Sequence, residues 1–393
     1  HYNNAAALVK QPVTPINEAL VYGRLHSRPC ELKLRRMMRG AVGKAVRFSP
    51  EIQPRSSREY LIMQPDFQPE AFNPSPLWLN AHAQTILANS LRPTNGVKFH
   101  RVRLDTHDGD FVDLDFASVS GVKLPRSAPV VLLLHGLEGS ARRGYACESY
   151  RQLAQRGVRA VGLNFRSCSG EMNRTHRLYH AGKTDDVDLV LEWLRDRLPG
   201  VRLGAVGFSL GANTLLKYLG EKGAETAVRA AAVVSPPFDL ARVADSFERG
   251  EGRRYAGRFL QDLQDKALVH ARRNGNSVDV HRIMNVKSMR EFDDAFTAPL
   301  HGFRDAAEYY ALNSSIHYVQ DIRVNTLVMR AMDDPFFAND IPHAALACNA
   351  FITPALTPYG GHVAFAEGNH PRKFRYWAER QAARFLAVTL FED

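Results

Sequence analysis

From about residue 97 to the C-terminus, short apolar runs alternate with amphipathic stretches. The runs are nearly continuous in aliphatic and β-branched residues, as strands buried on both faces require, and the stretches between them carry apolar residues at helical spacing. This alternation predicts an α/β fold: a mostly parallel sheet with helices on both faces. Strands are expected at 97–104, 111–116, 130–134, 160–165, 203–206, 230–234, 324–330 and 351–357. Helices are expected at 145–156, 185–197, 212–220, 306–313, 341–349 and 373–388.

One long interval interrupts this rhythm. Ninety positions separate Val234, at the end of one apolar run, from Val324, at the start of the next. The interval contains charged helical stretches such as 254–273. We therefore expect a helical cap inserted at about 239–320, laid over the carboxyl edge of the sheet, where open α/β sheets bind their ligands.

The first 62 residues differ from the rest of the chain. They show no helical or strand period, and five prolines interrupt them. They carry 11 Lys and Arg against 4 Asp and Glu, so they hold +7 of the total net charge of +10. We expect 1–62 to be a basic, poorly ordered extension, followed by one catalytic domain over 63–393. Because that domain is nearly neutral, no nucleic-acid partner is expected.

Cofactor, metal and membrane signals are weak throughout the sequence. The four cysteines are far apart and, with the histidines, lack the spacing of a zinc site. No apolar run approaches the roughly 20 residues that a membrane-spanning helix needs, and no signal-peptide pattern is found. The sequence therefore predicts a cytoplasmic protein with no cofactor, no metal and no integral membrane segment.

The sharpest chemical signal is Gly207-Phe208-Ser209-Leu210-Gly211. It follows an expected strand and precedes an expected helix, which is the context of the nucleophile elbow. The flanking glycines permit the tight turn that projects the serine hydroxyl above the sheet. The start of the helix places free N–H groups beside it. We interpret Ser209 as a catalytic nucleophile.

A serine hydroxyl becomes a good nucleophile only when a base accepts its proton, and a carboxylate should orient that base. The pair Asp333-Asp334 follows the expected strand at 324–330, and His362 lies 28 residues after Asp334, next to two glycines. We take His362 as the general base. We favour Asp334 over Asp333 as its partner, because Pro335 biases Asp334 toward an extended conformation.

An acyl-transfer site also needs two N–H donors for the oxyanion. Leu210, directly after the nucleophile, is one candidate, and Leu137, in the turn His135-Gly136-Leu137-Glu138-Gly139-Ser140, is the other. Six other histidines show no metal-ligand spacing and are interpreted as surface or structural residues; they are His82, His176, His180, His301, His343 and His370. For His180, within 179–182, a place in the lining of the pocket is the alternative.

Seven short motifs together resemble the YheT-like branch of the α/β-hydrolase superfamily, which also includes eukaryotic alpha/beta-hydrolase-domain esterases and ethanol acyltransferases. The resemblance runs from about Phe72 to the C-terminus. The motifs lie at 80–85, 135–140, 164–171, 179–182, 207–211, 333–336 and 360–362. Ser167 stands where the family pattern has glycine. The resemblance implies a triad of Ser209, Asp334 and His362, and activity on carboxylic esters with short to medium acyl chains.

The main hypothesis is thus a serine carboxylesterase acting on a small-molecule ester through an acyl-enzyme. The same triad would also serve acyl transfer to an alcohol, which differs only in whether water or the alcohol attacks the acyl-enzyme. A third hypothesis, a non-catalytic binding protein with the same fold, fits an intact triad poorly. The oligomeric state is not readable from the sequence.

Overall fold

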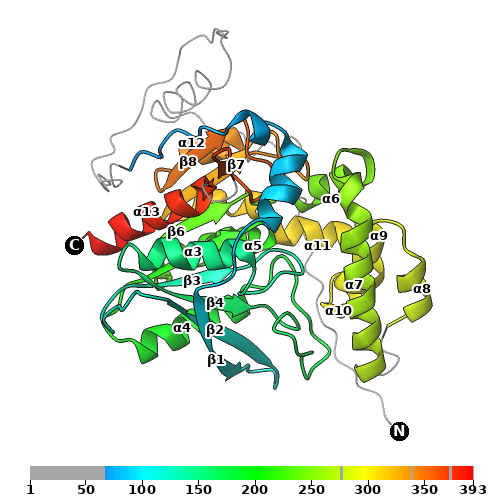
Figure 1. Cartoon of the computed structure of the whole chain (residues 1–393). Helices are drawn as coiled ribbons and strands as arrows, with labels where there is room; N and C mark the ends of the chain where they lie inside the picture. Colours follow the sequence, from blue (N-terminus) through cyan, green and yellow to red (C-terminus); the bar gives the residue numbers. More distant parts are fainter. Residues whose placement is uncertain (1–66, 275–277, 338–339, 371–373, 393) are drawn as a thin grey trace, which may run out of the picture.

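The computed structural model describes residues 67–274, 278–337, 340–370 and 374–392. An eight-stranded sheet runs through the domain in the order β1-β2-β4-β3-β5-β6-β7-β8 (Figure 1). The first two strands pair antiparallel with each other and β2 pairs antiparallel with β4, whereas all the other pairings are parallel. The strands are β1 (Val97–Asp105), β2 (Phe111–Val119), β3 (Val130–Leu134), β4 (Arg159–Asn164), β5 (Leu203–Phe208), β6 (Val228–Val234), β7 (Asn325–Ala331) and β8 (Ile352–Thr357). The predicted fold class is confirmed.

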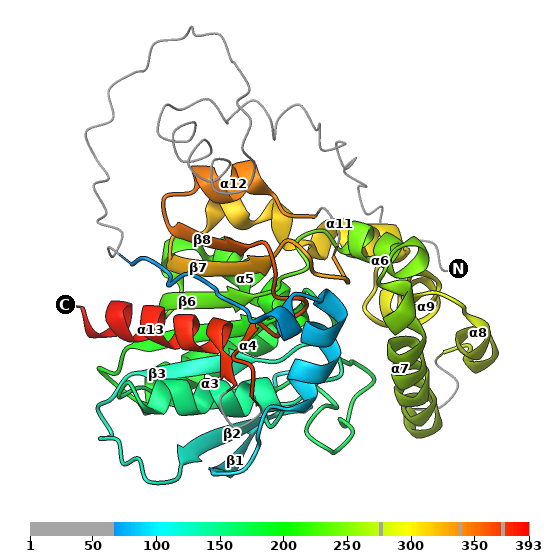
Figure 2. The ribbon, with the colours of Figure 1, turned by 45° about the horizontal axis from the view of Figure 1, so that its top comes forward.

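Helices cover both faces of the sheet because successive strand residues point to opposite sides. In β3, Val131 and Leu133 pack toward α3 (Gly144–Ala154) and α13 (Trp377–Phe391). Leu132 packs toward the other face. There lie α4 (Asp185–Arg197), α5 (Leu210–Lys222) and α12 (His343–Cys348). Figure 2 shows α13 and α3 in front of the strands and α5 behind them.

The interval between β6 and β7 is helical, as expected, and its longest helices lie to one side of the sheet (Figure 1). It contains α6 (Leu240–Arg249), α7 (Arg253–Asn274), α8 (Val280–Asn285), α9 (Met289–Phe292), η4 (Asp293–Thr297), α10 (Ala298–Leu300), α11 (Ala306–Asn313), η5 (Ser315–His317) and η6 (Val319–Asp321). Aromatic and aliphatic side chains from α7, α8, α9 and η4 form a separate core together with Leu178. The bounds of 239–320 for the cap stay a prediction.

Two short helices precede the sheet where no element was expected. They are η1 (Pro76–Trp78) and η2 (Ala83–Ala88), a π-helical stretch. The buried amide of Gln84 joins η2 to η1 and to the C-terminal part of the chain: Nε2 donates to Trp78 O (2.9 Å), and Oε1 accepts from Ala366 N–H (2.8 Å). The predicted extension, 1–62, lies outside the described residues. The remaining elements are η3 (Gly223–Glu225), β9 (Ala366–Glu367) and β10 (Arg375–Tyr376).

Candidate active site

Ser209 occupies the turn between β5 and α5. Its φ of 51° lies in the left-handed region, which a residue with a side chain adopts at an energetic cost and which is frequent at active sites. The two glycines are required sterically: a Cβ on Gly207 would lie 2.6 Å from Gly211 O, and one on Gly211 would overlap His135 O. The Ser209 N–H donates to Val234 O at 2.9 Å. The turn is therefore held tightly, with the hydroxyl raised above the end of the sheet.

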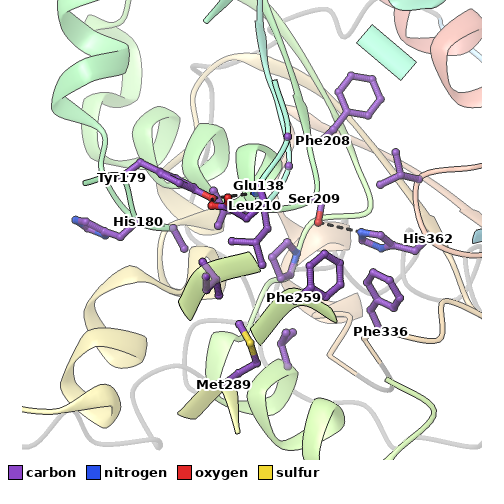
Figure 3. A pocket seen from close by; sticks show the side chains of 18 of the residues that line it. Glu138, Tyr179, His180, Phe208, Ser209, Leu210, Phe259, Met289, Phe336 and His362 are labelled. Carbon is purple, nitrogen blue, oxygen red and sulfur yellow. Dashed lines mark hydrogen bonds between the residues drawn. The ribbon is translucent and has the colours of Figure 1, made fainter. Parts of the chain in front are cut away.

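Three residues predicted from separate motifs meet at this turn. His362 Nε2 lies 2.9 Å from Ser209 Oγ, and His362 Nδ1 lies 2.9 Å from Asp334 Oδ2 (Figure 3 shows the first contact). Because an ionised carboxylate only accepts hydrogen bonds, Nδ1 carries the ring hydrogen and Nε2 is left to accept from the serine hydroxyl. The arrangement can transfer a proton from serine to histidine.

Asp334 is buried, and an arginine and a backbone N–H donate hydrogen bonds to its carboxylate in addition to His362. Arg330 Nη1 donates to Asp334 Oδ2, and the Phe336 N–H donates to Asp334 Oδ1 at 2.9 Å. Burial alone would raise the pKa of Asp334, but His362 and then Arg330 hold it below its ordinary value. The carboxylate therefore stays ionised, as the orientation of His362 requires.

Arg330 itself is fully buried at the end of β7. Its second amino group donates to Asp340 Oδ1 at 2.8 Å and to Phe337 O at 2.6 Å. This arginine therefore joins two carboxylates, Asp334 and Asp340, and fixes the position of the first. Sequence reasoning missed both Arg330 and Asp340, although a charged residue inside the apolar run Thr326–Ala331 was a usable signal.

Asp333 faces a different partner. Its Oδ1 accepts the Gly361 N–H at 2.9 Å, so this carboxyl supports the backbone of the histidine loop and does not contact the imidazole. Burial raises its pKa above the ordinary value, and the neighbouring Asp334 charge adds to that rise. Of the two aspartates, only Asp334 contacts His362.

The loop that carries His362 has an unusual backbone. Gly361, Val363 and Phe365 all have positive φ, at 58°, 61° and 49°. A side chain on Gly361 would also meet Ala81 O at 2.7 Å. The loop therefore needs outside contacts to keep its shape, and residues of and around η2 supply them.

Side chains from the η2 region bind this loop at successive backbone groups. Thr85 Oγ1 accepts the His362 N–H at 2.9 Å, and Asn89 Nδ2 donates to His362 O at 3.2 Å. Arg92 Nη2 donates to the next two carbonyls, Val363 O and Ala364 O, at 2.7 and 2.8 Å. Sequence reasoning assigned no role to Asn89 or Arg92, and Thr85 entered it only as part of the motif at 80–85.

Arg92 is held in turn by a buried carboxylate. Its Nη2 lies 2.7 Å from Glu379 Oε1, and both side chains are fully buried. The Arg92 guanidinium also lies over the Tyr376 ring, 4.3 Å from its centroid. The position of His362 thus depends on contacts that reach from η2 to α13.

The predicted oxyanion donors lie beside Ser209. A Cβ on Gly136 would lie 3.2 Å from Ser209 Cβ, so the 135–140 turn lies close against Ser209. Three other N–H groups of this turn have partners: Gly136 N–H donates to the Tyr145 hydroxyl, Glu138 N–H to the Tyr179 hydroxyl, and Gly139 N–H to Gly136 O. Within the described residues, the N–H groups of Leu137 and Leu210 donate to no protein atom, and both residues line the cavity at Ser209.

The buried His135 side chain holds this turn through hydrogen bonds at both ring nitrogens. Its Nε2 accepts the Phe165 N–H at 3.1 Å, so the ring hydrogen is on Nδ1, which donates to Gly136 O at 2.7 Å. Complete burial lowers its pKa to about 3. The ring is therefore neutral at ordinary pH, and its two hydrogen bonds hold the turn against the backbone of Phe165.

A cavity of about 700 Å³ opens over Ser209 and His362. Helices of the β6–β7 interval supply most of its apolar wall, as Figure 3 shows for Phe259 and Met289. The Lys266 ammonium on α7 lies 2.8 Å from a Glu138 carboxylate oxygen, which joins the interval to the 135–140 turn. Wall residues from the interval include Val243, Phe247, Phe259, Leu263, Met289 and Phe292.

Two of the remaining histidines also line this cavity. His180 and His301 lie with their ring centroids 4.5 Å apart, and burial lowers the pKa of both. His82 lies outside it, with Nδ1 2.6 Å from the Tyr255 hydroxyl and Nε2 2.8 Å from Glu251 Oε2. Across the described residues, no three His, Cys, Asp or Glu side chains gather in a way that could hold a metal ion.

The helices that the structure describes include none with both the length and the apolar character needed to cross a membrane.

The chain is similar to a family of hydrolases and to individual esterases and lipases. Residues 129–368 match the family model described as the alpha/beta hydrolase fold. YheT of Escherichia coli (strain K12), named as an esterase, is 35% identical over 317 residues, 79% of this chain and 91% of that protein. The mouse (Mus musculus) phospholipase ABHD3 is 30% identical over 78% of this chain and 76% of its own length. The yeast (Saccharomyces cerevisiae, strain ATCC 204508 / S288c) medium-chain fatty acid ethyl ester synthase/esterase 2 is 32% identical over 67% of this chain and 63% of its own length.

Proposed function

This chain belongs to the α/β-hydrolase family and is a hydrolase of the esterase and lipase type, and from that membership we propose that it is a serine carboxylesterase. Ser209 is the nucleophile, His362 the general base and Asp334 the residue that orients the base. The observation that carries the proposal is the pair of 2.9 Å contacts that join these three side chains. An accidental cluster would not also place two unbonded N–H groups beside the serine.

The reaction follows from these positions. Ser209 Oγ attacks the ester carbonyl carbon while His362 Nε2 accepts the hydroxyl proton. The carbonyl oxygen becomes an oxyanion, which accepts hydrogen bonds from the N–H groups of Leu137 and Leu210. His362 then donates its proton to the departing alkoxide, and the acyl group remains on Ser209. Water, deprotonated by His362, releases the acid and restores the serine.

The substrate class follows from the wall of the cavity. Each methylene that enters an apolar cavity gains about 0.8 kcal/mol of burial. Because the helices of the β6–β7 interval close the cavity on one side, its depth is finite. An acyl chain longer than that depth must displace packed side chains, which costs free energy. Esters with short to medium acyl chains should therefore react fastest.

A series of p-nitrophenyl esters of increasing acyl length tests this proposal. We expect kcat/KM to rise with length to an optimum within roughly two to eight carbons and then to fall. Emulsified long-chain triglyceride should react more slowly than soluble butyrate ester under matched conditions. Faster hydrolysis of the emulsified oil would contradict the substrate class and favour an interfacial lipase.

Acyl transfer to an alcohol is the second candidate, and one comparison favours it. The yeast relative is named both a synthase and an esterase of fatty acid ethyl esters. The two functions share the acyl-enzyme and differ only in whether water or the alcohol attacks it. Hydrolysis with ethanol present distinguishes them: an esterase yields mainly free acid, whereas a transferase yields mainly ethyl ester.

A further inference from the structure

Exposed aliphatic side chains are concentrated in the segment that contains η1 and η2. Twelve large apolar residues are exposed in the described chain, and five of them belong to this one segment, whereas the others are scattered. Single exposed apolar residues need no explanation, but a cluster marks an interaction surface. The five are Leu77, Leu79, Ile86, Leu87 and Leu91, with exposed fractions of 41–57%. We call this set the η1–η2 patch.

The other side of η2 faces the catalytic cavity. Thr85, Asn89 and Ser90 line the cavity, whereas Ile86 and Leu87 do not. Ser90 is itself exposed, so this part of the segment lies at the cavity mouth. The η1–η2 patch therefore forms part of the outer rim of the entrance to Ser209.

An apolar groove of about 350 Å³ continues the patch toward α7. Ile86, Tyr255 and Phe259 line it, and the His82 ring bridges the two sides through its 2.6 Å contact with the Tyr255 hydroxyl. Phe259 also lines the catalytic cavity. The apolar surface thus extends from η2 across the groove to the wall of the active site.

Two arginines of α7, Arg254 and Arg258, complete the lining of this groove. Both are exposed. Arg254 pairs with Glu251 at 3.8 Å, and Glu251 also lies 2.8 Å from His82. Arg258 makes no ion pair with any described residue. An apolar surface edged by two exposed arginines, of which Arg258 has no carboxylate partner among the described residues, complements a surface that is apolar inside and anionic outside.

This charge makes two other occupants, residues 1–62 and a second copy of the chain, less favourable than an anionic surface. Residues 1–62 carry +7, so the arginines would repel them. A second copy of the chain docked through the same patch would bring a second pair of arginines toward the first. An anionic phospholipid bilayer complements both the apolar patch and the arginines, because its acyl region accommodates aliphatic side chains and its phosphates bind arginine.

We propose that the η1–η2 patch docks this enzyme on the surface of an anionic phospholipid bilayer. The aliphatic side chains enter the boundary between headgroups and acyl chains, and Arg254 and Arg258 bind phosphates. The cavity mouth then faces the lipid, so an ester dissolved in the bilayer reaches Ser209 without crossing water. Docking goes beyond the proposed esterase function, because hydrolysis of a soluble ester does not require it.

Co-sedimentation of the full chain with vesicles tests the docking. We expect binding to vesicles of phosphatidylcholine with phosphatidylglycerol, and much weaker binding to phosphatidylcholine alone. The double variant Ile86→Ser/Leu87→Ser should bind at least about tenfold more weakly. The matched variant Leu312→Ser/Val388→Ser removes two exposed aliphatic side chains elsewhere, at 49% and 45% exposure, and should bind like the wild type.

The arginines have a separate test. Arg254→Gln/Arg258→Gln should weaken binding to the anionic vesicles about tenfold, whereas Arg195→Gln/Arg197→Gln on α4 should not. Hydrolysis of soluble p-nitrophenyl butyrate by Ile86→Ser/Leu87→Ser should stay within about twofold of wild type, because both side chains are exposed and make none of the hydrogen bonds that hold the His362 loop. Vesicle binding and hydrolysis of the soluble ester therefore test the docking proposal and the esterase proposal separately.

Three results would overturn the proposal. The first is an absence of binding to anionic vesicles. The second is equal binding by wild type and Ile86→Ser/Leu87→Ser, which would assign the affinity to another part of the chain, such as the basic residues 1–62. The third is a dimer in sedimentation velocity that Ile86→Ser/Leu87→Ser dissociates, which would make a second copy the occupant of the patch.

Discussion

At the scale of single residues, Asp333 and Asp334 are neighbours in sequence with different surroundings. Asp334 contacts His362 and Arg330, which keep its carboxylate ionised. Asp333 instead accepts a backbone hydrogen bond from Gly361 and has a raised pKa because it is buried. Only Asp334 is placed to orient His362, the proposed base, so substitutions that preserve shape and remove charge should separate the roles of the two aspartates.

We predict that Asp334→Asn lowers kcat by on the order of 10⁴, because an amide can hold His362 in the wrong tautomer. Asp333→Asn should lower it far less, since the amide oxygen can still accept the Gly361 N–H. Turnover of p-nitrophenyl butyrate measures both, with melting temperatures as the control for folding. The opposite order of effects would assign the orienting role to Asp333.

The positions of Ser209, Asp334 and His362 could be proposed from sequence because each lies in a short local pattern. Arg330, Asp340, Asn89 and Arg92 could not, because their roles come from pairings that the folded chain creates. Arg92, for example, binds a carbonyl 271 positions away. Neither periodicity nor motif spacing in the sequence predicts such a contact. The catalytic roles of Ser209, Asp334 and His362 stay predictions.

At the scale of elements, η2 and its flanking residues form a support for the His362 loop. Sequence periodicity did not reveal this element, because a short π-helical stretch has neither the length nor the repeat of an amphipathic helix. Only the resemblance drew attention to residues 80–85. The strands of the sheet were predictable for the opposite reason: burial on both faces leaves long apolar runs.

We predict that Asn89→Ala lowers kcat by up to about 10²-fold with little change in KM, because a displacement of His362 by about 1 Å misaligns proton transfer. Ser90→Ala is the matched control: Ser90 is the next residue, and its hydroxyl bonds only Ile86 O within its own segment. Steady-state kinetics and melting temperatures measure both variants. A fall in kcat no larger for Asn89→Ala than for Ser90→Ala would show that the loop holds its shape without this contact.

At the scale of the whole molecule, the fold class could be predicted from the alternation of apolar runs with amphipathic stretches. The spatial order of the strands could not. The order β2-β4-β3-β5 reverses part of the sequence order, and nothing in the composition of the strands encodes it. This order matters for function, because it brings the turn after β3, with Leu137, next to the turn after β5, with Ser209. The two proposed oxyanion donors therefore follow neighbouring strands.

We predict that removal of residues 1–62 leaves kcat and melting temperature nearly unchanged. The segment lacks the apolar periodicity that would let it pack on the catalytic domain, although it carries most of the net charge. Turnover of soluble p-nitrophenyl butyrate and a thermal melt of the shortened protein measure the effect. A large fall in either quantity would show that the segment packs against the domain.

The most direct test of the central claim is covalent labelling of Ser209. A fluorophosphonate reacts only with a serine activated by its base, and mass spectrometry of the digested protein locates the adduct. We predict one label per chain on the peptide that contains Ser209, no label on Ser209→Ala, and at least about 10³-fold slower labelling of His362→Ala. Labelling of Ser209→Ala at the wild-type rate, or a wild-type Ser209 that stays unlabelled, would contradict the account.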